Sequence, residues 1–568
     1  MDLWNQSSRL RRLAAAAGLF ACLLIASPVK AQERLQLDKA PSATANATKP
    51  VLVVTIASIN KLMQDINYVS SAVGQPQAGG MFAMLAGTFT QGIDMDSPIG
   101  VLVPLVDGAP QPIAVIPTND VKSILKRLEG QTGPADELDD GTLVIAVGAN
   151  TVYIRQMGSW AAMASRKDLL DLAPADPTAL FNGLGNDFDL AFRLQMQQVP
   201  AETRNMLVAQ IRQGFDQAMD SQDGAESDSA RDLADQSMKQ LEQFFNETDT
   251  LQFGLNIDQQ AKQIAIDTSF TAVAGTTLAA IYGGQQPIPS QFASVIRDDA
   301  AAYYHGATSI SPEAVEYTRT TLKSTLASLG GALENEDELT PQQRDDIRTM
   351  VDRLADLAVA TIEEGRADFG ALLLADQNDF NFVSGAFVAD GNEAAQIVKD
   401  LAEKVKNENG APRFKFDVSN YKDVAMHVIE ADVPAKEDEA RKVFGDTLRV
   451  HIGTGPKAVY VAVGDNSEYM MKELIDKSTL DQGADRPVGQ LKMTLLPILE
   501  YANSIESNEV ISAMISALNA APDQGRLTVV QSSIENGQSS AIRIGEGLLR
   551  AISAAVMQSR QGGAPNQF

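Results

Sequence analysis

The chain has 568 residues and a formal net charge of −27 at pH 7, because 73 Asp and Glu residues outnumber 46 Lys and Arg residues. Nucleic acid is therefore not an expected partner, since binding to it depends on basic side chains that neutralise phosphates. Cys22 is the only cysteine, which excludes a disulfide within the chain and a metal site built from several thiolates.

The first residues predict a secretory signal peptide over 1–31. Basic residues precede an apolar stretch from Leu13 to Ile25, and the small residues Val29 and Ala31 precede a cleavage position between Ala31 and Gln32. The apolar stretch is shorter than the roughly 20 residues of a membrane-spanning helix. We therefore expect a periplasmic or extracellular protein whose mature chain has neither a transmembrane segment nor a cysteine.

Two other kinds of export signal remain open at this point. Arg11 and Arg12 would suit a twin-arginine signal, although the residues that follow fit that pattern poorly. The segment Leu19–Cys22 would suit a lipoprotein acceptor, but the apolar run continues beyond the cysteine. Ordinary export is the favoured interpretation. A flexible tether over 32–50, rich in Ala, Thr, Ser and Pro, is expected to follow.

The next segment, residues 51–282, predicts an α+β domain. Short apolar runs indicate strands, a run with helical periodicity indicates a helix after Asn119-Asp120, and the Gly-containing break at 148–150 indicates a hairpin. The expected strands are 51–58, 100–105, 112–117, 141–147, 151–154, 251–257 and 263–270.

The same series of patterns returns in residues 293–558, after a linker over 283–292. The second helix begins after Asp390-Gly-Asn392, and the second hairpin breaks at Gly453-Thr-Gly455. The expected strands are 301–308, 370–375, 382–389, 446–452, 458–463, 527–533 and 539–544. We therefore predict a tandem duplication of one domain, each copy a mainly antiparallel sheet with amphipathic helices packed on it. A cleft between the copies and a disordered tail over 559–568 are also expected.

Metal-binding patterns are weak. The three histidines, His305, His427 and His451, lie far apart in sequence on strand-like runs, and a structural role is favoured over zinc binding. The acidic run Asp220–Asp228 lacks the spacing of a calcium loop, as does Asp376–Asp379. A weak, irregular calcium site in these loops stays open, but we expect no metal and no cofactor.

Catalytic motifs are also weak. The sequence contains no phosphate-binding loop of the Gly-x-x-x-x-Gly-Lys-Ser/Thr type and no Gly-x-Ser-x-Gly nucleophile motif. Two Ser-x-x-Lys matches, Ser123–Lys126 and Ser419–Lys422, lack the companion motifs of penicillin-recognising enzymes. Asp94, Asp96 and Asp120 are the carboxylates on which an unrecognised hydrolase site would rest. No catalytic residue is predicted.

Residues 50–130 resemble a known group of sequences. The segments Val51–Tyr68, Gly92–Gly100 and Ile116–Asp120 are similar to those of uncharacterised exported proteins of planctomycete-type bacteria. This resemblance implies export and a scaffold of strand, Leu-rich helix, turn and strand. It implies no catalytic residues.

The sequence as a whole favours an exported, non-enzymatic protein with a binding or structural role in the periplasm or cell envelope. Its partner would be an envelope protein or a small ligand. Two alternatives are a carrier of lipid or another hydrophobic ligand, and a hydrolase that uses the three carboxylates.

Overall fold

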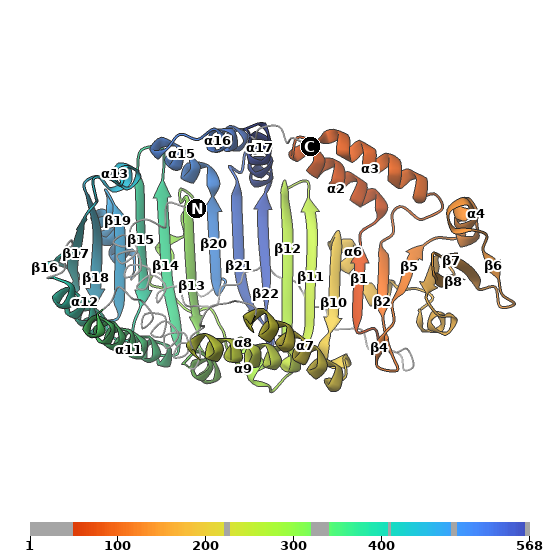
Figure 1. Ribbon diagram of the computed structural model, residues 1–568, viewed down its shortest axis with the longest axis horizontal. Coiled ribbons are helices and arrows are strands. Elements are labelled where there is room, and N and C mark those ends of the chain that lie inside the picture. Colours follow the sequence, from red (N-terminus) through yellow and green to blue (C-terminus); the bar gives the residue numbers. More distant parts are fainter. Residues whose placement is uncertain (1–48, 221–227, 320–339, 407–410, 479–485, 563–568) are drawn as a thin grey trace.

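The computed structural model describes residues 49–220, 228–319, 340–406, 411–478 and 486–562. The predicted signal peptide, nearly all of the predicted tether and most of the acidic run 220–228 lie outside these residues. The fold is of the mixed α+β class, with one large antiparallel sheet and helices gathered at the ends of its strands (Figure 1).

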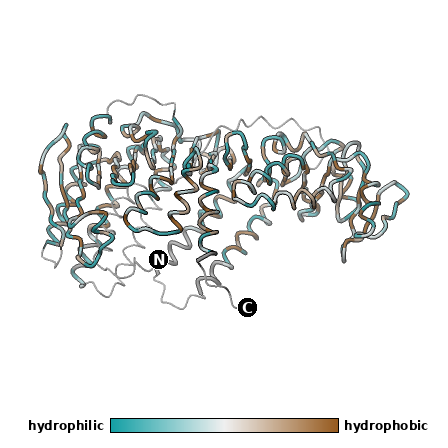
Figure 2. The backbone as a smooth tube through the Cα atoms, turned by 90° about the horizontal axis from the view of Figure 1, so that it is seen from above, coloured by the Kyte–Doolittle hydropathy of each residue, from teal (hydrophilic) through white to brown (hydrophobic). Residues whose placement is uncertain are grey.

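The described residues form a single sheet of 20 strands, in which every neighbouring pair is antiparallel. Figure 1 shows these strands side by side along the long axis of the molecule, and Figure 2 shows the same elongated molecule from above. From the outer edge inward, the first half contains β6 (Asp136–Glu137), β7 (Leu143–Val147), β8 (Asn150–Met157), β9 (Trp160–Ala164), β5 (Ile113–Pro117), β2 (Ile99–Val103), β1 (Leu52–Ile56), β10 (Leu190–Gln195), β11 (Thr248–Asp258) and β12 (Gln263–Ala272).

The second half continues the sheet outward to its other edge. Its strands, in order from the middle, are β22 (Gly537–Gly545), β21 (Arg526–Ile534), β20 (Gly489–Thr494), β13 (Ala302–Ser309), β14 (Arg366–Ala375), β15 (Phe380–Phe387), β19 (Ala458–Gly464), β18 (Thr447–Gly455), β17 (Val424–Asp432) and β16 (Arg413–Tyr421). A separate small hairpin joins β3 (Leu105–Val106) and β4 (Ala109–Pro110).

The two halves meet where β12 pairs with β22, along a ladder that runs from Gln263↔Gly545 to Thr271↔Gly537. We call this pairing the joint. The expectation of two separate sheets with a cleft between them is therefore wrong. Taken alone, each half would end at a strand whose outer backbone groups have no partner, β12 in the first half and β22 in the second. The pairing of these two edge strands satisfies those groups.

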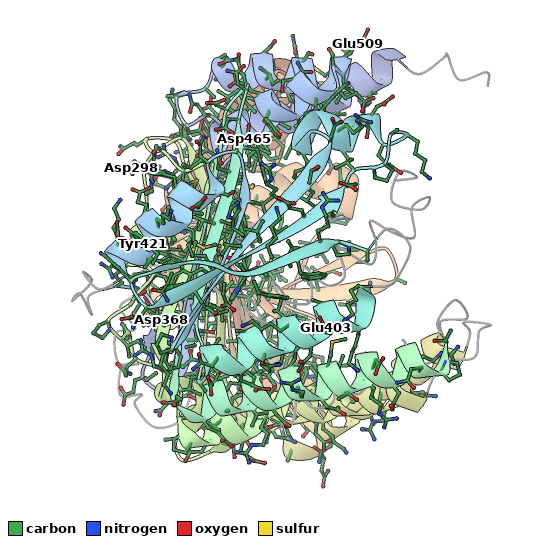
Figure 3. All side chains as sticks on the ribbon, turned by 90° about the vertical axis from the view of Figure 1, so that its left-hand side faces the viewer. Asp298, Asp368, Glu403, Tyr421, Asp465 and Glu509 are labelled. Atoms are coloured by element: carbon green, nitrogen blue, oxygen red, sulfur yellow. The ribbon has the colours of Figure 1, made fainter. Side chains whose placement is uncertain are left out.

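Helices lie in two groups, one at each end of the strands. Figure 3 looks at the sheet from the side of β16 and shows one group above the strands and the other below. The upper group contains α2 (Ile59–Ala72), α3 (Pro76–Phe89), α15 (Leu495–Ile505), α16 (Glu509–Asn519) and α17 (Glu546–Gly562). The lower group contains α7 (Ala201–Asp220), α8 (Asp228–Glu247), α9 (Thr277–Gly283), α11 (Pro341–Glu363) and α12 (Gly391–Val405).

Short helices cover one face of the outer parts of the sheet. In the first half, η2 (Lys167–Leu172), α5 (Thr178–Phe181) and α6 (Leu184–Asp187) pack on buried strand residues such as Ile113. In the second half, η4 (Ala293–Val295) and α14 (Ser467–Lys477) pack on residues such as Val383 and Ala462. These two clusters are the largest parts of the buried core.

Two predicted helix starts are confirmed. Asp120 precedes α4 (Val121–Thr132), and its carboxylate accepts a hydrogen bond from the amide of Ser123 at 3.1 Å. Asp390 precedes α12 and accepts from the amides of Asn392 and Glu393. In both cases a short acidic side chain satisfies amides that have no partner within the helix.

The second predicted hairpin is correct, but its turn lies later than expected. Strands β18 and β19 are joined at Pro456-Lys457, and Gly453 lies within the strand. Here the glycine is needed for packing rather than for the turn. A Cβ atom at Gly453 would lie 3.0 Å from Val424 Cγ1 and 3.1 Å from Met471 Sδ.

Two predicted boundary segments have definite surroundings in the structure. Within the predicted linker 283–292, Ser290 and Phe292 are buried in the second half. The expected disordered tail from residue 559 begins too early, since α17 continues to Gly562. The residues Gln558, Ser559, Arg560 and Gln561 are compatible with a helix, and the next strong helix breaker after them is Gly562 at its end.

Candidate ligand-binding face

The middle of the sheet carries two lines of apolar side chains that cross the joint. On one face, directly paired residues form a row from β1 to β14: Ile56, Leu190, Leu255, Ile266, Ile542, Val529, Leu491, Tyr304 and Ala371. A second row on the same face runs from β11 to β15: Ile257, Ile264, Ile544, Leu527, Met493, Ala302, Leu373 and Phe382. We call these the apolar rows.

The side chains of the apolar rows remain partly accessible to solvent. Every one of them is at least partly exposed, and none belongs to the clusters of buried residues found in the described chain. Ile56 is 36% exposed and Leu190 is 43% exposed. With a spacing of about 4.8 Å between strands, the first row extends over roughly 40 Å. A continuous apolar surface of this length is unusual on a folded protein.

An aromatic pair extends this surface at one end. Phe192 on β10 lies directly opposite Phe253 on β11, and their rings stack with centroids 5.5 Å apart and planes 15° apart. Phe192 is 37% exposed. Stacked rings of this kind form a flat apolar platform that a ligand could contact.

The opposite face of the same central strands is polar. Arg543, which lies between Ile542 and Ile544, forms a salt bridge with Asp267 at 2.8 Å. Because successive residues of a strand point to opposite faces, this ion pair lies behind the apolar rows. The buried polar residues Gln252, Ser269 and Ser539 lie on the same side as the ion pair. The central strands therefore have one polar and one apolar face.

The upper helices begin where the apolar rows end. Helix α17 follows directly after β22, α15 follows directly after β20, and α2 begins three residues after Ile56. Helices α2 and α17 are tied together, because Tyr68 donates a hydrogen bond to Glu546 at 2.7 Å and Ser553 donates to the carbonyl of Val73 at 2.7 Å. The apolar face thus has a continuous helical border at this end of the strands.

A polar network of Lys61 with the buried carboxylates of Asp65 and Asp189 lies at the same end. Lys61 Nζ contacts Asp65 at 2.9 Å, the carboxylate of Asp189, and the side-chain oxygen of Asn256 at 3.2 Å. Burial raises the pKa of Asp189 although Lys61 opposes this effect. Burial alone would lower the pKa of Lys61, but its bonds to the two carboxylates outweigh it and the pKa is raised. Because every group is paired, the network is suited to fixing α2 on the sheet.

The three histidines do not converge. His427 lies directly opposite Ile452, so the next residue, His451, points to the other face of the sheet. His305 is on β13, several strands away, and its Nε2 lies 2.9 Å from Ser290 Oγ. His427 accepts a hydrogen bond from the amide of Asp417 and contacts Thr454 Oγ1 at 2.9 Å. Burial lowers the pKa of both His427 and His451.

Ser290, His305 and Asp368 form a trio whose residue types suggest nucleophilic catalysis. The order of contacts differs from that of a catalytic triad, since Ser290 Oγ lies between the other two and donates to Asp368 at 2.6 Å. All three residues are almost fully buried. The trio therefore serves to hold the segment before β13 against β14.

The carboxylates considered for a hydrolase act as local turn and cap residues. Asp94 accepts from the amide of Asp96 at 3.0 Å and from Ser97 Oγ at 2.8 Å, and these bonds lower its pKa. Asp96 accepts from Asn60 at 2.8 Å. The bond from the Ser123 hydroxyl lowers the pKa of Asp120. A general acid needs a raised pKa, so Asp94 and Asp120 lack that feature.

The other motifs have equally local surroundings. Ser123 lies in the first turn of α4, and its hydroxyl donates a hydrogen bond to the cap residue Asp120. Lys422 forms a salt bridge with Asp476 at 2.8 Å. Asp376 accepts hydrogen bonds from the amides of Asn378 and Asp379, as expected of a turn. Among the described residues, no group of three or more His, Cys, Asp or Glu side chains is placed to hold a metal ion.

An open depression of about 700 Å³ lies at the lower end of the joint. Its lining includes the acidic residues Asp249 and Glu535 and the amides of Gln197 and Asn536. Its lining also includes the apolar residues Ala272, Val273 and Ile534. Within the described part of the chain, no helix is both long enough and apolar enough to cross a membrane.

The sequence patterns did not identify the apolar rows as a site. Most of their residues lie in predicted strands, but the expectation was that apolar faces are covered by helices. The available signal was the polar residue enclosed by apolar ones, as in Ile542-Arg543-Ile544, repeated in several strands. That signal indicates two faces of opposite character without saying which one is left open.

Comparisons with known proteins add little. No family model matches the chain, and no curated protein is similar to it. A solved structure described as crystal form IV of TP0453 aligns over 40% of this chain and 81% of that chain, with 4% identity and a TM-score of 0.22. A likeness this low carries no argument about fold or function.

Proposed function

We propose that the protein is a non-enzymatic binding protein whose ligand is a lipid or another elongated hydrophobic molecule. The observation that carries this proposal is the pair of apolar rows, which continue across the joint with Tyr304 as their only residue bearing a polar group and stay partly accessible. Covering such a surface removes apolar area from water, which is favourable by about 25 cal/mol per Å².

The dimensions suit a ligand with long hydrocarbon chains. The first row spans nine strands, or roughly 40 Å, whereas a compact ligand would be expected in an enclosed cavity. The rows end at the helical border, where α17 and α15 follow directly after β22 and β20. A head group could lie there while the hydrocarbon lies along the strands.

The test is to purify the protein from its own host without detergent, extract it with organic solvent and analyse the extract by mass spectrometry. The expected result is lipid in a fixed ratio to protein. The stripped protein should then bind a fluorescent fatty acid with saturation. Absence of lipid in the extract, together with no saturable binding, would overturn the proposal.

We also propose that the protein is exported, on the basis of the basic and apolar residues at its start. Export would place an apolar ligand-binding face where envelope lipids are handled. N-terminal sequencing of the protein from an extracytoplasmic fraction is expected to begin at Gln32. A chain that keeps Met1 and stays in the cytosolic fraction would exclude this part of the proposal.

Finally, we propose that the two halves arose by duplication. Support comes from the strand order, because each half, followed from its outer edge to the joint, uses its strands in the same sequence. In this alignment β8 and β9 correspond to β18 and β19, one strand later than the hairpin correspondence expected from the sequence. Experimental structures of the two halves that failed to superpose strand for strand would contradict this history.

A further inference from the structure

Helix α3 is the most apolar exposed element of the described chain. It packs against α2, where Gly79 approaches so closely that a Cβ atom would lie 2.3 Å from Asn67 Oδ1. Its other side projects large apolar side chains into solvent: Met81 is 63% exposed, Met84 70% and Leu85 55%. Phe82 is 40% exposed. A helix normally turns such residues toward a core.

The helix also lacks charge. At the overall charged share of 21%, its 14 residues would carry about three charged side chains, yet they carry none. The lower helices differ strongly, since α11 alone contains Arg344, Asp345, Asp346, Arg348, Asp352, Arg353, Asp356 and Glu363. Helices α3 and α11 therefore present opposite surfaces, one without charged side chains and one rich in them.

Resting on the proposed lipid ligand, we infer that α3 docks on the surface of a phospholipid bilayer with no net charge. The position of α3 supports this occupant. The helix is joined through α2 to the end of β1, where Ile56 begins the first apolar row, so a bilayer at α3 would adjoin the apolar face. A lipid could then pass between the bilayer and the rows with little exposure to water.

Charge argues for a bilayer over a second copy of the chain and for neutral lipids over anionic ones. Two copies that each carry a net charge of −27 repel each other, and an anionic membrane surface repels each copy for the same reason. At about 21 Å, a 14-residue helix is too short to span the hydrocarbon core but can lie along the interface. The flexible side chains of Met81 and Met84 suit a fluid surface.

The test is flotation of the full chain with phosphatidylcholine vesicles. The variant Met81→Gln/Met84→Gln/Leu85→Gln is expected to lower the partition coefficient by about 100-fold, because three half-exposed side chains no longer leave water. The matched control is Met206→Gln/Leu207→Gln/Ile211→Gln on α7, whose side chains are 55%, 43% and 42% exposed at the charged border. This control should float like the parent chain.

A second measurement locates the contact directly. Tryptophan introduced by Phe82→Trp should be quenched by brominated acyl chains, whereas tryptophan introduced by Met206→Trp should not. Absence of parent flotation, flotation with anionic vesicles alone, or equal loss in the α3 and α7 variants would each overturn the inference. Binding of soluble fluorescent fatty acid in the absence of vesicles separates the two proposals. If the parent chain does not bind the fatty acid, the proposal of a lipid ligand is refuted. If it binds the fatty acid but does not float with the vesicles, only the proposed docking of α3 on a bilayer is refuted.

Discussion

Replacing exposed members of the apolar face should weaken ligand binding without unfolding the protein. The variant Ile56→Gln/Leu190→Gln/Phe192→Gln changes three neighbouring side chains that are 36%, 43% and 37% exposed. Full burial of such side chains is worth about 1.5–3 kcal/mol each. Because about two fifths of each side chain is still exposed, a ligand that covers this exposed part gains roughly 1 kcal/mol from each side chain. Together they contribute about 3 kcal/mol, or roughly 100-fold in Kd.

The assay is fluorescence titration of the stripped protein with a fluorescent fatty acid, accompanied by thermal unfolding. A matched control is Val147→Gln/Val418→Gln, since these residues are 48% and 49% exposed but lie on β7 and β16, far from the joint. The control should bind like the parent. Equal affinity of the three-residue variant and the parent, at equal melting temperature, would refute the assignment of the binding face.

Three further predictions concern stability. Phe292→Ala should lower the free energy of unfolding by about 3–5 kcal/mol, because the side chain is fully buried; a loss below 1 kcal/mol in urea unfolding would contradict its place in the core. Tyr68→Phe should cost about 1 kcal/mol by removing the hydrogen bond from α2 to α17, and calorimetry should show a correspondingly lower Tm. Burial holds the pKa of His427 and His451 below the ordinary 6.5, so below that pH the unfolded chain binds more protons than the folded chain. The free energy of unfolding should therefore be highest above pH 6.5 and fall as the pH drops below it. His427→Gln should weaken this pH dependence, as measured by urea unfolding at several pH values.

Local features of the fold could be predicted from the sequence. The caps at Asp120 and Asp390 depend on a few adjacent residues, and both helices begin there. Strands such as β11 and β22 have clear alternation. The short strands β10 and β20 were not predicted, because LAFRLQ and GQLKMT are brief and mixed in polarity. These two strands connect the outer strands to the middle of the sheet, so without them the single sheet could not be foreseen.

The candidate site was harder to predict than the fold. The alternation Ile542-Arg543-Ile544 shows that one face is apolar, and the usual expectation is that helices cover that face. Which face is covered depends on where the helices pack, and this is decided by contacts between residues hundreds of positions apart. The bond between Tyr68 and Glu546 is one such contact.

The pairing register at the joint also decides which side chains of the two halves share a face of the sheet. Ile266 faces Ile542 across it, and Asp267 faces Ala541 on the other side. A slip of one residue along this single ladder would turn every side chain of one half over relative to the other. Arg543 and its neighbours would then interrupt the apolar rows halfway along their length. Sequence changes in β12 or β22 that leave each half intact could thus divide one long binding face into two short ones.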